Sequence, residues 1–193
     1  MKVTKGEKMN AKRIQKAIEF AVKKHRNQLR KGSGLPYIIH PFSVMRYLLD
    51  MGAGEDAVIA GLLHDTLEDT NTTYRELRWK FGQHVADIVK FCSENKSLPW
   101  QERKAETIES LAACHDVDML QVEFADKLSN LRDIHRECSA DGFWNRFNKN
   151  KKSQQWYYGE LYRCIAEHCD DCDWFEDLRA EFHDKYCDIF GRK

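Results

Sequence analysis

The residues best suited to chemistry lie in one short segment, GLLHDTLED. Four ionisable side chains, His64, Asp65, Glu68 and Asp69, follow directly on an apolar run. If the segment is helical, Glu68 lies one turn from both His64 and Asp65, and Asp69 lies one turn from Asp65. Burial of such groups without partners is unfavourable, and a bound cation would relieve the repulsion among the carboxylates. The alternative is a solvated helix end on which the acids lie by chance.

Two other segments favour a site over a solvated helix end. PYIIHP places His40 between an extended stretch and the start of a helix, which is a rigid position for a ligand. VEFADKLSNL places Asp126 on an otherwise apolar helix, and Asn130 lies one turn further along the same face. An aspartate on such a face needs a metal ion or a charged partner. The alternative partners for Asp126 are Arg132 or the N-terminus of a helix.

Two imidazoles and two carboxylates make a mixed nitrogen and oxygen donor set. The candidate ligands of one divalent metal ion are His40, His64, Asp65 and Asp126. Such a set suits Mn²⁺ or Fe²⁺ and is compatible with Zn²⁺, whereas thiolates would indicate structural zinc. A metal with four protein ligands and open positions can activate water and polarise a phosphate. Glu68 and Asp69 are then placed to accept a proton from that water or to orient it.

The elements that position these residues are predicted to be helices. Only three prolines occur, Pro36, Pro41 and Pro99, and long stretches between them carry apolar residues at helical spacing. The pattern predicts an all-α fold with about eight to ten helices. The segments concerned lie at about 10–31, 41–49, 58–65, 71–81, 85–91, 100–114, 116–134, 153–168 and 171–186. The first of them is expected to be capped by Asn10.

Composition limits the class of protein. The 193 residues predict one domain over 1–193, with the motifs in a core at about 10–136 and further helices at about 137–190. Lysine plus arginine equals aspartate plus glutamate at 31 each, so no bulk attraction to nucleic acid or an anionic membrane is expected. No stretch approaches the roughly 20 apolar residues of a membrane helix, and MKVTKGEKMNAKR lacks the apolar core of a secretory signal. Seven cysteines, an odd number, favour a reducing cytoplasm.

The ordered motifs resemble a known family. His40, then His64-Asp65, then Asp126 resembles the H…HD…D signature of the HD superfamily of metal-dependent phosphohydrolases. HRNQLRKGSGLPYIIHP, GLLHDTLEDT, FGQHVADIV and FADKLSNLRDI resemble the hydrolase domain of the Rel/Spo alarmone enzymes and their small stand-alone relatives. The resemblance extends from about Ile18 to His135, and it implies that the helical domain is of the HD type.

The resemblance also implies an activity and a set of site residues. Members of that family hydrolyse guanosine tetra- and pentaphosphate, (p)ppGpp, release pyrophosphate from the 3′ position, and usually depend on Mn²⁺. The four candidate ligands match the metal ligands of the family, and Glu68 and Asp69 match its catalytic acids. The residues that match nucleotide-binding positions are Arg30, Lys31, Asn130 and Tyr157. Read from the residues alone, Arg30 and Lys31 fit equally well as a basic helix C-terminus favoured by the helix dipole.

Some features depart from the family and leave the substrate open. The chain is too short for the synthetase and regulatory domains of the bifunctional enzymes, so synthesis is not expected. SENKSLPWQERK and FWNRFNKNKKSQQWYY differ from the best-known alarmone hydrolases. The alternatives are hydrolysis of another nucleotide, such as a nucleoside monophosphate or a phosphorylated dinucleotide, and a regulatory module that binds a nucleotide without turnover. The Glu68-Asp69 pair argues against the regulatory module, because binding alone does not need both acids.

Three other features allow more than one interpretation. The aromatic and basic residues of 143–158 form either a wall of the nucleotide pocket or, as we favour for all but Tyr157, an aromatic core beneath solvated lysines. Cys169 and Cys172 form a single CxxC, which is a weak zinc signal. His25 and Gln28 lie one turn apart near Arg30 and are expected to face the ligands or substrate, or to be half-buried. No long apolar stripe requires a dimer, although relatives often form homo-oligomers.

Overall fold

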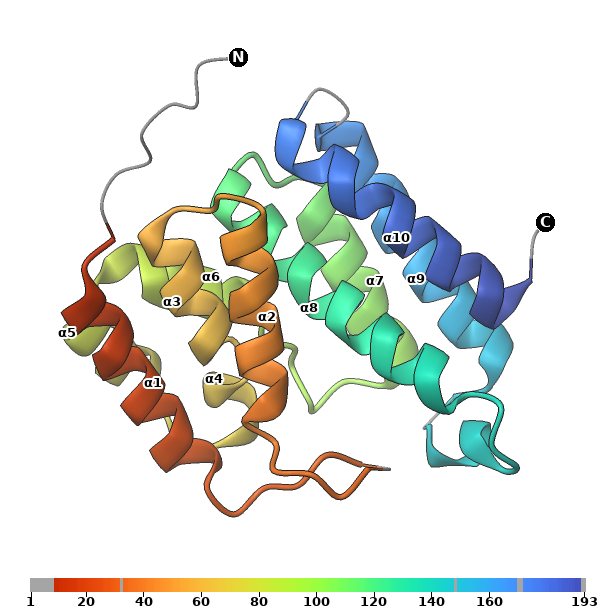
Figure 1. Cartoon of the computed structure of the whole chain (residues 1–193), viewed down its shortest axis with the longest axis horizontal. Coiled ribbons are helices and arrows are strands. Elements are labelled where there is room, and N and C mark those ends of the chain that lie inside the picture. Colours follow the sequence, from red (N-terminus) through yellow and green to blue (C-terminus); the bar gives the residue numbers. More distant parts are fainter. Residues whose placement is uncertain (1–8, 32, 148, 170–171, 192–193) are drawn as a thin grey trace.

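The computed structural model describes residues 9–31, 33–147, 149–169 and 172–191 (Figure 1). In this part of the chain the regular elements are helices, and the only β-type pairing is an isolated bridge between Leu29 and Pro36. The all-α prediction is therefore confirmed. The elements are α1 (Ala11–His25), α2 (Ile39–Asp50), α3 (Glu55–Leu63), α4 (Thr66–Asp69), α5 (Tyr74–Phe81), α6 (Gln83–Phe91), α7 (Trp100–Ala112), α8 (Val117–Glu137), the 3-10 helix η1 (Phe143–Arg146), α9 (Lys151–Cys169) and α10 (Asp173–Phe190).

The first helix begins as predicted and ends early. The Asn10 side chain accepts hydrogen bonds from the backbone N–H groups of Lys12 and Arg13, at 3.1 and 3.4 Å. The predicted end near Lys31 is wrong, because α1 stops at His25. Beyond it the backbone N–H of Arg30 donates to Leu35 O at 2.8 Å, and that of Tyr37 donates to Gln28 O at 2.9 Å. These bonds fold 28–37 back on itself, so Arg30 lies in a loop and not at a helix C-terminus.

Helices α2, α3 and α8 form the centre of the molecule, with α1, α5 and α6 on one side (Figure 1). All seven residues from Ala57 to Leu63 of α3 are buried. Gly61 lets α3 approach α2 closely, because a Cβ at this position would lie 2.3 Å from Leu48 Cδ1 and 3.2 Å from Val44 Cγ1. This contact brings the start of α2 and the end of α3 together.

The last two helices, α9 and α10, cover the opposite side of α8 (Figure 1). Aromatic rings form this contact: the ring of Phe124 on α8 lies 5.2 Å from that of Phe175 and 5.4 Å from that of Phe182 on α10. The predicted helix at 153–168 corresponds to α9. The predicted helix at 171–186 corresponds to α10, although its first residue lies outside the described residues.

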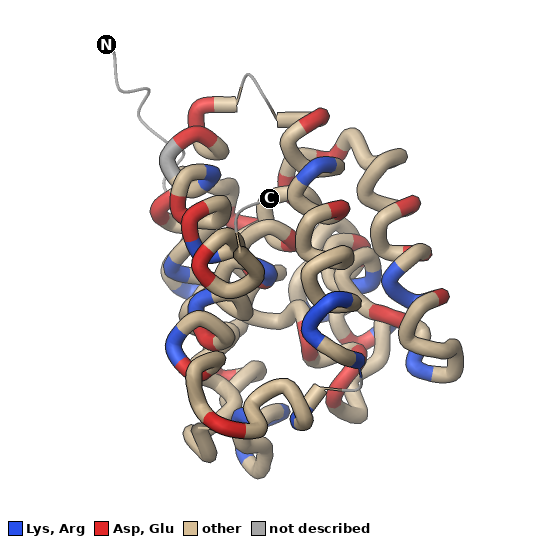
Figure 2. Tube along the Cα trace, turned by 90° about the vertical axis from the view of Figure 1, so that its right-hand side faces the viewer, with Lys and Arg blue, Asp and Glu red and all other residues tan. Residues whose placement is uncertain are grey.

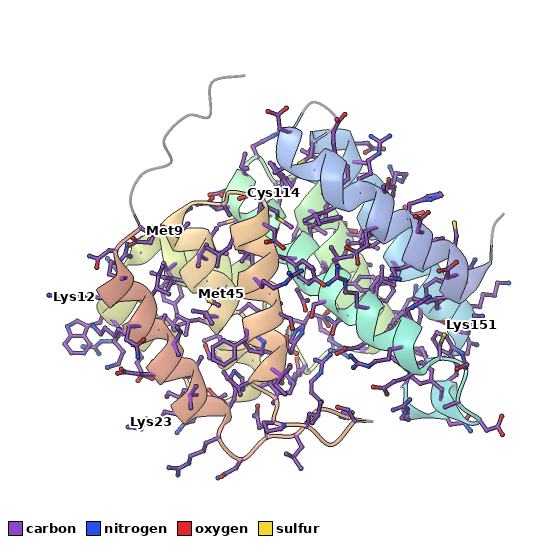
Figure 3. The ribbon with its side chains drawn as sticks, viewed as in Figure 1. Met9, Lys12, Lys23, Met45, Cys114 and Lys151 are labelled. Atoms are coloured by element: carbon purple, nitrogen blue, oxygen red, sulfur yellow. The ribbon has the colours of Figure 1, made fainter. Side chains whose placement is uncertain are left out.

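Charged side chains of both signs alternate over the surface. Figure 2 shows Lys and Arg interspersed with Asp and Glu along the helices, in keeping with 31 residues of each class. Lys12 and Lys23 on α1 and Lys151 on α9 point away from the helical body (Figure 3). None of the described helices combines the length and the apolar character needed to cross a membrane.

The aromatic contact between α8 and α10 generates a stability prediction. Phe182→Ala should lower the free energy of unfolding by about 3–5 kcal/mol, because the side chain is 1% exposed and its loss leaves a cavity. Trp79→Ala is the control, since this indole is 80% exposed and its loss should change stability by no more than about 0.5 kcal/mol. Urea unfolding followed by circular dichroism measures both, and equal effects would contradict the packing described here.

Candidate metal centre

Three separate parts of the chain bring the four candidate ligands together. His40 is the second residue of α2, His64 and Asp65 lie between α3 and α4, and Asp126 lies in the middle of α8. His40 Nε2 is 2.9 Å from Asp126 Oδ1 and 3.7 Å from Asp65 Oδ2. His64 Nε2 is 2.9 Å from Asp65 Oδ2 and 3.6 Å from Asp126 Oδ1. The metal ligands predicted from the sequence thus face one another across a single small volume.

The second nitrogen of each imidazole is held by a fixed partner. His64 Nδ1 lies 2.8 Å from the carbonyl oxygen of Gly61, which can only accept, so this nitrogen carries the hydrogen. His40 Nδ1 lies 3.0 Å from Ser129 Oγ. Both Nε2 atoms therefore point into the cluster, and such outer partners orient an imidazole toward a metal.

The carboxylates are oriented by three donors from the adjoining surface. The Tyr37 hydroxyl donates to Asp65 Oδ2 at 2.6 Å. On α8, Lys127 Nζ donates to Asp126 Oδ2 at 2.6 Å and the Asn130 amide donates to Asp126 Oδ1 at 2.7 Å. Arg132, the alternative partner considered for Asp126, instead pairs with Glu181 on α10. The charged partner of Asp126 within the chain is therefore Lys127 and not Arg132.

Burial and charge show that the cluster fits a cation. His64 Nε2 is buried without a hydrogen-bond partner. Burial lowers the pKa of His40, while for His64 the carboxylates of Asp65 and Asp126 outweigh burial and raise the pKa. The pKa of Asp65 is lowered: burial acts against this, but the charge of His64 outweighs it. Two ionised carboxylates and two inward-facing imidazole nitrogens are a donor set for one divalent metal ion.

Glu68 and Asp69 lie on α4, directly after this cluster. Glu68 Oε2 accepts the backbone N–H of Glu94 at 3.0 Å, and burial raises the pKa of Glu68. Lys96 Nζ is 3.3 Å from Glu68 Oε1 and also pairs with Asp69. The break between α3 and α4 keeps helical spacing, since the Asp69 N–H donates to Asp65 O at 2.8 Å. The acids therefore keep the relation to Asp65 that the sequence predicted.

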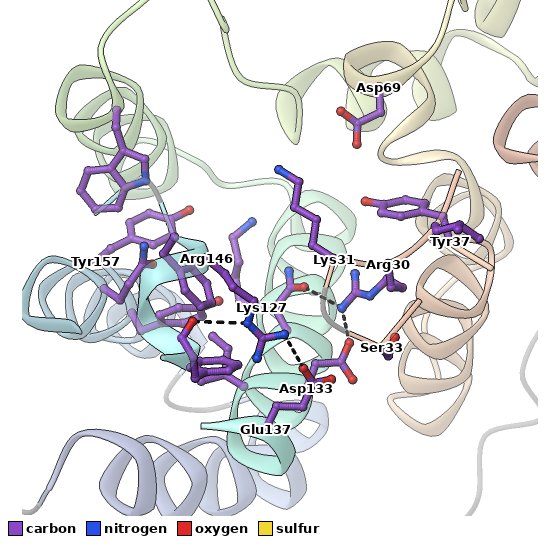
Figure 4. Close-up of a pocket in the computed structure, with 18 of the residues that line it drawn as sticks. Arg30, Lys31, Ser33, Tyr37, Asp69, Lys127, Asp133, Glu137, Arg146 and Tyr157 are labelled. Carbon is purple, nitrogen blue, oxygen red and sulfur yellow. Dashed lines mark hydrogen bonds and ion pairs between the residues drawn. The ribbon is translucent and has the colours of Figure 1, made fainter. Parts of the chain in front are cut away.

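A pocket of about 630 Å³ adjoins the cluster (Figure 4). All four predicted nucleotide-binding residues line it: Arg30, Lys31, Asn130 and Tyr157. Arg30 pairs with Asp133, and its Nη2 lies 3.4 Å from Asn130 Oδ1. The Tyr157 ring is 2% exposed, and its hydroxyl is buried without a partner. Asp69 also lines the pocket, which therefore extends from the candidate acids to the predicted nucleotide-binding residues.

Sequence reasoning missed Tyr37 and Lys127. A signal for Lys127 was present, because a lysine beside Asp126 and one turn from Glu123 on an apolar helix indicates a buried ion network. Its Nζ lies 2.8 Å from Glu123 Oε1. For Tyr37 the sequence showed only that it lies in PYIIHP. Its contact with Asp65 depends on the fold of the loop.

Part of the aromatic and basic segment 143–158 lines the pocket, and His25 lies beneath a candidate acid. Of the aromatic and basic segment, Phe143, Arg146, Phe147, Gln154, Tyr157 and Tyr158 line the pocket, whereas the Trp144 ring packs against Phe190. His25 is buried, and its Nδ1 lies 2.6 Å from Gln28 Oε1, while Gln28 donates to Asp69 O at 2.6 Å. His25 thus supports the backbone of a candidate acid.

The CxxC segment gives no metal cluster among the described residues. The Cys172 N–H donates to Cys169 O at 2.9 Å, and residues 170–171 between them lie outside the described part. Another group with the composition of a metal site, His84, Asp116 and Asp118, is only half-buried. There His84 lies 3.0 Å from Asp118 through Nε2 and 3.8 Å from Asp116 through Nδ1, so its two nitrogens face different carboxylates as in an ion pair.

Comparison with known proteins agrees with this fold and site. The family model described as the HD domain matches residues 17–144, and the chain belongs to this family. It is 46% identical over 129 residues to the guanosine-3′,5′-bis(diphosphate) 3′-pyrophosphohydrolase MESH1 of Danio rerio, a match that covers 65% of this chain and 71% of that protein.

Two solved structures extend the comparison to nearly the whole chain. One, described as a metazoan ortholog of SpoT that hydrolyses ppGpp, has a TM-score of 0.77 and 25% identity, and covers 92% of this chain and 98% of its own. A Listeria monocytogenes crystal structure has a TM-score of 0.73 and 33% identity, and covers 86% of this chain and 100% of its own. The fold therefore matches these structures beyond the HD segment.

The cluster predicts that metal binding depends on Asp65. Asp65→Ala should abolish the bound divalent ion, since one of two carboxylates is lost from a buried site, while the far-ultraviolet circular dichroism stays helical. Elemental analysis of the purified protein should find about one ion per chain in the unaltered protein. Asp118→Asn, in the half-buried His84 group, is the matched control and should leave the metal content unchanged. Retention of the ion by Asp65→Ala would contradict the assignment.

Proposed function

We propose that this chain is a metal-dependent hydrolase that removes pyrophosphate from the 3′ position of (p)ppGpp. The observation that supports this most strongly is the junction of two features. Tyr37, Lys127 and Asn130 hydrogen-bond Asp65 and Asp126 of the cluster, and the same three residues line the pocket together with Arg30, Lys31 and Tyr157. The Danio rerio relative is a guanosine-3′,5′-bis(diphosphate) 3′-pyrophosphohydrolase, and the metazoan ortholog of SpoT hydrolyses ppGpp. We further propose Mn²⁺ as the metal, with Fe²⁺ or Zn²⁺ also compatible with the donor set.

The four proposed ligands hold the metal between α2, the α3–α4 junction and α8. When bound there, a divalent ion supplies a Lewis acid for the phosphate and lowers the pKa of coordinated water. Tyr37, Asn130 and Lys127 fix the carboxylate orientations through their hydrogen bonds to Asp65 and Asp126. The ligand geometry is thereby set before substrate arrives, which is the preorganisation that catalysis requires.

Glu68 and Asp69 are the proposed acids for proton transfer. Burial raises the pKa of Glu68, which makes its carboxylate a stronger base than a solvated glutamate. Lys96 contacts both acids, and Asp69 lines the pocket. In the proposed reaction one acid accepts a proton from the attacking water as the water oxygen bonds to phosphorus. The bond between the 3′ oxygen and phosphorus breaks and the 3′ oxygen takes up a proton, so pyrophosphate and a 5′-phosphorylated guanosine with a free 3′ hydroxyl are the products.

The pocket holds the nucleotide next to these groups. Arg30 and Lys31 come from the loop over 28–37, and Asn130 comes from α8 one turn after Asp126. A guanidinium and an ammonium bind phosphate oxygens or stack on a base, and an amide bonds sugar hydroxyls. We assign this binding role to Arg30, Lys31, Asn130 and Tyr157.

We propose that residues 1–193 act as one domain, with the motifs at about 10–136 and the helices at about 137–190 closing the pocket. The lining contributed by Tyr157 of α9 supports this, because the pocket would be open without it.

All seven cysteines are free thiols, which supports the cytoplasmic location expected from the sequence.

The proposed chemistry predicts the effect of replacing one acid by its uncharged amide. Glu68→Gln should lower kcat for (p)ppGpp by about 10²–10⁴-fold, because the amide cannot accept a proton. Its metal content should not change, since Glu68 is not among the proposed ligands. Glu109→Gln, at an exposed position of α7, is the control and should retain full activity.

The products and a nucleotide panel distinguish the alternatives. Pyrophosphate from (p)ppGpp with Mn²⁺ supports the proposal. Release of phosphate from nucleoside monophosphates or phosphorylated dinucleotides would indicate instead that the chain is an HD phosphohydrolase with another nucleotide substrate. A metal-loaded protein that binds nucleotides and turns none over would indicate a regulatory module.

A further inference from the structure

The two proposed acids lie on a helix of a single turn. Helix α4 contains only Thr66–Asp69, and a helix this short needs contacts with the rest of the chain to hold its place. Lys96 contacts both acids, but its side chain is 52% exposed, and exposed ion pairs contribute little. The Glu68 carboxylate is held in addition by the backbone N–H of Glu94. The position of Asp69 therefore depends on a further contact.

Two side chains at the end of α1 and just after it supply that contact. The Gln28 amide donates through Nε2 to Asp69 O at 2.6 Å, which is one of the last carbonyls of α4. A carbonyl oxygen can only accept, so the amide nitrogen faces Asp69 and the amide oxygen faces His25. His25 Nδ1 lies 2.6 Å from Gln28 Oε1 and therefore carries the hydrogen. The imidazole thus fixes the amide that holds Asp69.

The burial of His25 is unfavourable in itself. Its side chain is 1% exposed, and its Nε2 is buried without a hydrogen-bond partner. An unpaired buried nitrogen destabilises the fold, and an apolar residue of similar shape would avoid this. What an apolar residue could not provide is the hydrogen bond from Nδ1 to Gln28. This bond is therefore the feature that sets the imidazole apart from an ordinary core residue.

The same imidazole also lies against a residue that contacts the metal cluster. Its ring centre is 5.1 Å from that of Tyr37, whose hydroxyl donates to Asp65 Oδ2 at 2.6 Å. The Tyr37 N–H in turn donates to Gln28 O at 2.9 Å. Figure 4 shows Tyr37 and Asp69 on the same side of the pocket. One buried histidine thus supports both the partner of a proposed ligand and a proposed acid.

We infer that His25 is a positioning residue, which sets the place of Asp69 through Gln28. The inference rests on the proposed function for the reaction in which Asp69 takes part. His25 lies outside the lining of the pocket, so it acts on the rate of hydrolysis and not on the binding of the nucleotide. The backbone bonds that fold 28–37 do not involve the imidazole. The loop that carries Arg30 therefore keeps its fold when the side chain of His25 is changed.

The experiment uses two substitutions that separate the ring of His25 from its hydrogen bond. His25→Phe keeps a ring against Tyr37 and removes the bond to Gln28, whereas His25→Asn removes the ring and keeps an N–H near the position of Nδ1. With Mn²⁺, His25→Phe should lower kcat for (p)ppGpp about tenfold and change KM by less than about twofold. His25→Asn should recover most of kcat. Both variants should bind as much metal as the unaltered protein.

A second measurement does not depend on catalysis. Hydrogen–deuterium exchange of the metal-free protein reports on the amides of Asp69 and Thr70, which bond to the carbonyls of Asp65 and Thr66. In His25→Phe these amides should exchange about tenfold faster, because α4 is less firmly held, while exchange in α8 stays unchanged. A general loss of stability would instead increase exchange in both helices. His25→Asn should restore the protection of α4.

A double variant tests whether His25 acts through Gln28. Gln28→Met should reproduce the effects of His25→Phe on kcat and on exchange in α4. The double variant should be no slower than either single variant, because both substitutions remove the same link. Gln15→Met is the control, since Gln15 lies on the exposed side of α1 and bonds Glu19 at 2.9 Å. It should leave kcat and exchange unchanged.

Three results would overturn the inference. They are unchanged kcat and α4 exchange in His25→Phe, faster exchange along the whole chain, and additive losses of kcat in the double variant. The proposed function fails separately, if the unaltered protein releases no pyrophosphate from (p)ppGpp. Exchange in α4 would then still decide whether His25 holds Asp69 in place.

Discussion

The structure depends on the compensation of charge in one buried volume. Two ionised carboxylates and two imidazoles meet there between α2, α3 and α8, where His40, His64 and Asp126 are buried. Like charges in such a place repel, and each needs a hydrogen bond or a counter-ion. Tyr37 and Asn130 donate to the carboxylate oxygens that also face the imidazoles, and Lys127 donates to the other oxygen of Asp126. The helices around this volume bring together a donor set that one divalent cation would complete.

The charged residues that line the pocket are also compensated by neighbouring side chains. Several cations that line it pair with neighbouring carboxylates: Arg30 with Asp133, Arg146 with Glu137, and both Arg103 and Lys104 with Glu94. Lys127, which also lines the pocket, pairs with Glu123 and Asp126. The pocket thus holds its cations in place through ion pairs within the chain.

Sequence reasoning predicted the helices and the residues of the candidate metal cluster because both have a local or compositional signal. A buried aspartate at residue 126 and the acids after His64 conflict with an apolar helix unless they have a function, and this conflict is visible in the sequence. The predicted end of α1 was wrong because residues 28–37 fold back through the bonds from Arg30 N–H to Leu35 O and from Tyr37 N–H to Gln28 O, and helical periodicity does not register such bonds. Tyr37 was missed for a similar reason: its partner, Asp65, is distant in the chain.

The candidate ligands are far apart along the chain, and this separation links metal binding to folding. His40 comes from the start of α2, and its partners Asp126 and Ser129 lie on α8, 89 residues away in the case of Ser129. A chain in which α8 has not docked possesses only isolated ligands of low affinity. Metal therefore binds the native state in preference to the unfolded state and stabilises it by mass action. Removal of the ion is therefore expected to lower the free energy of unfolding of the protein.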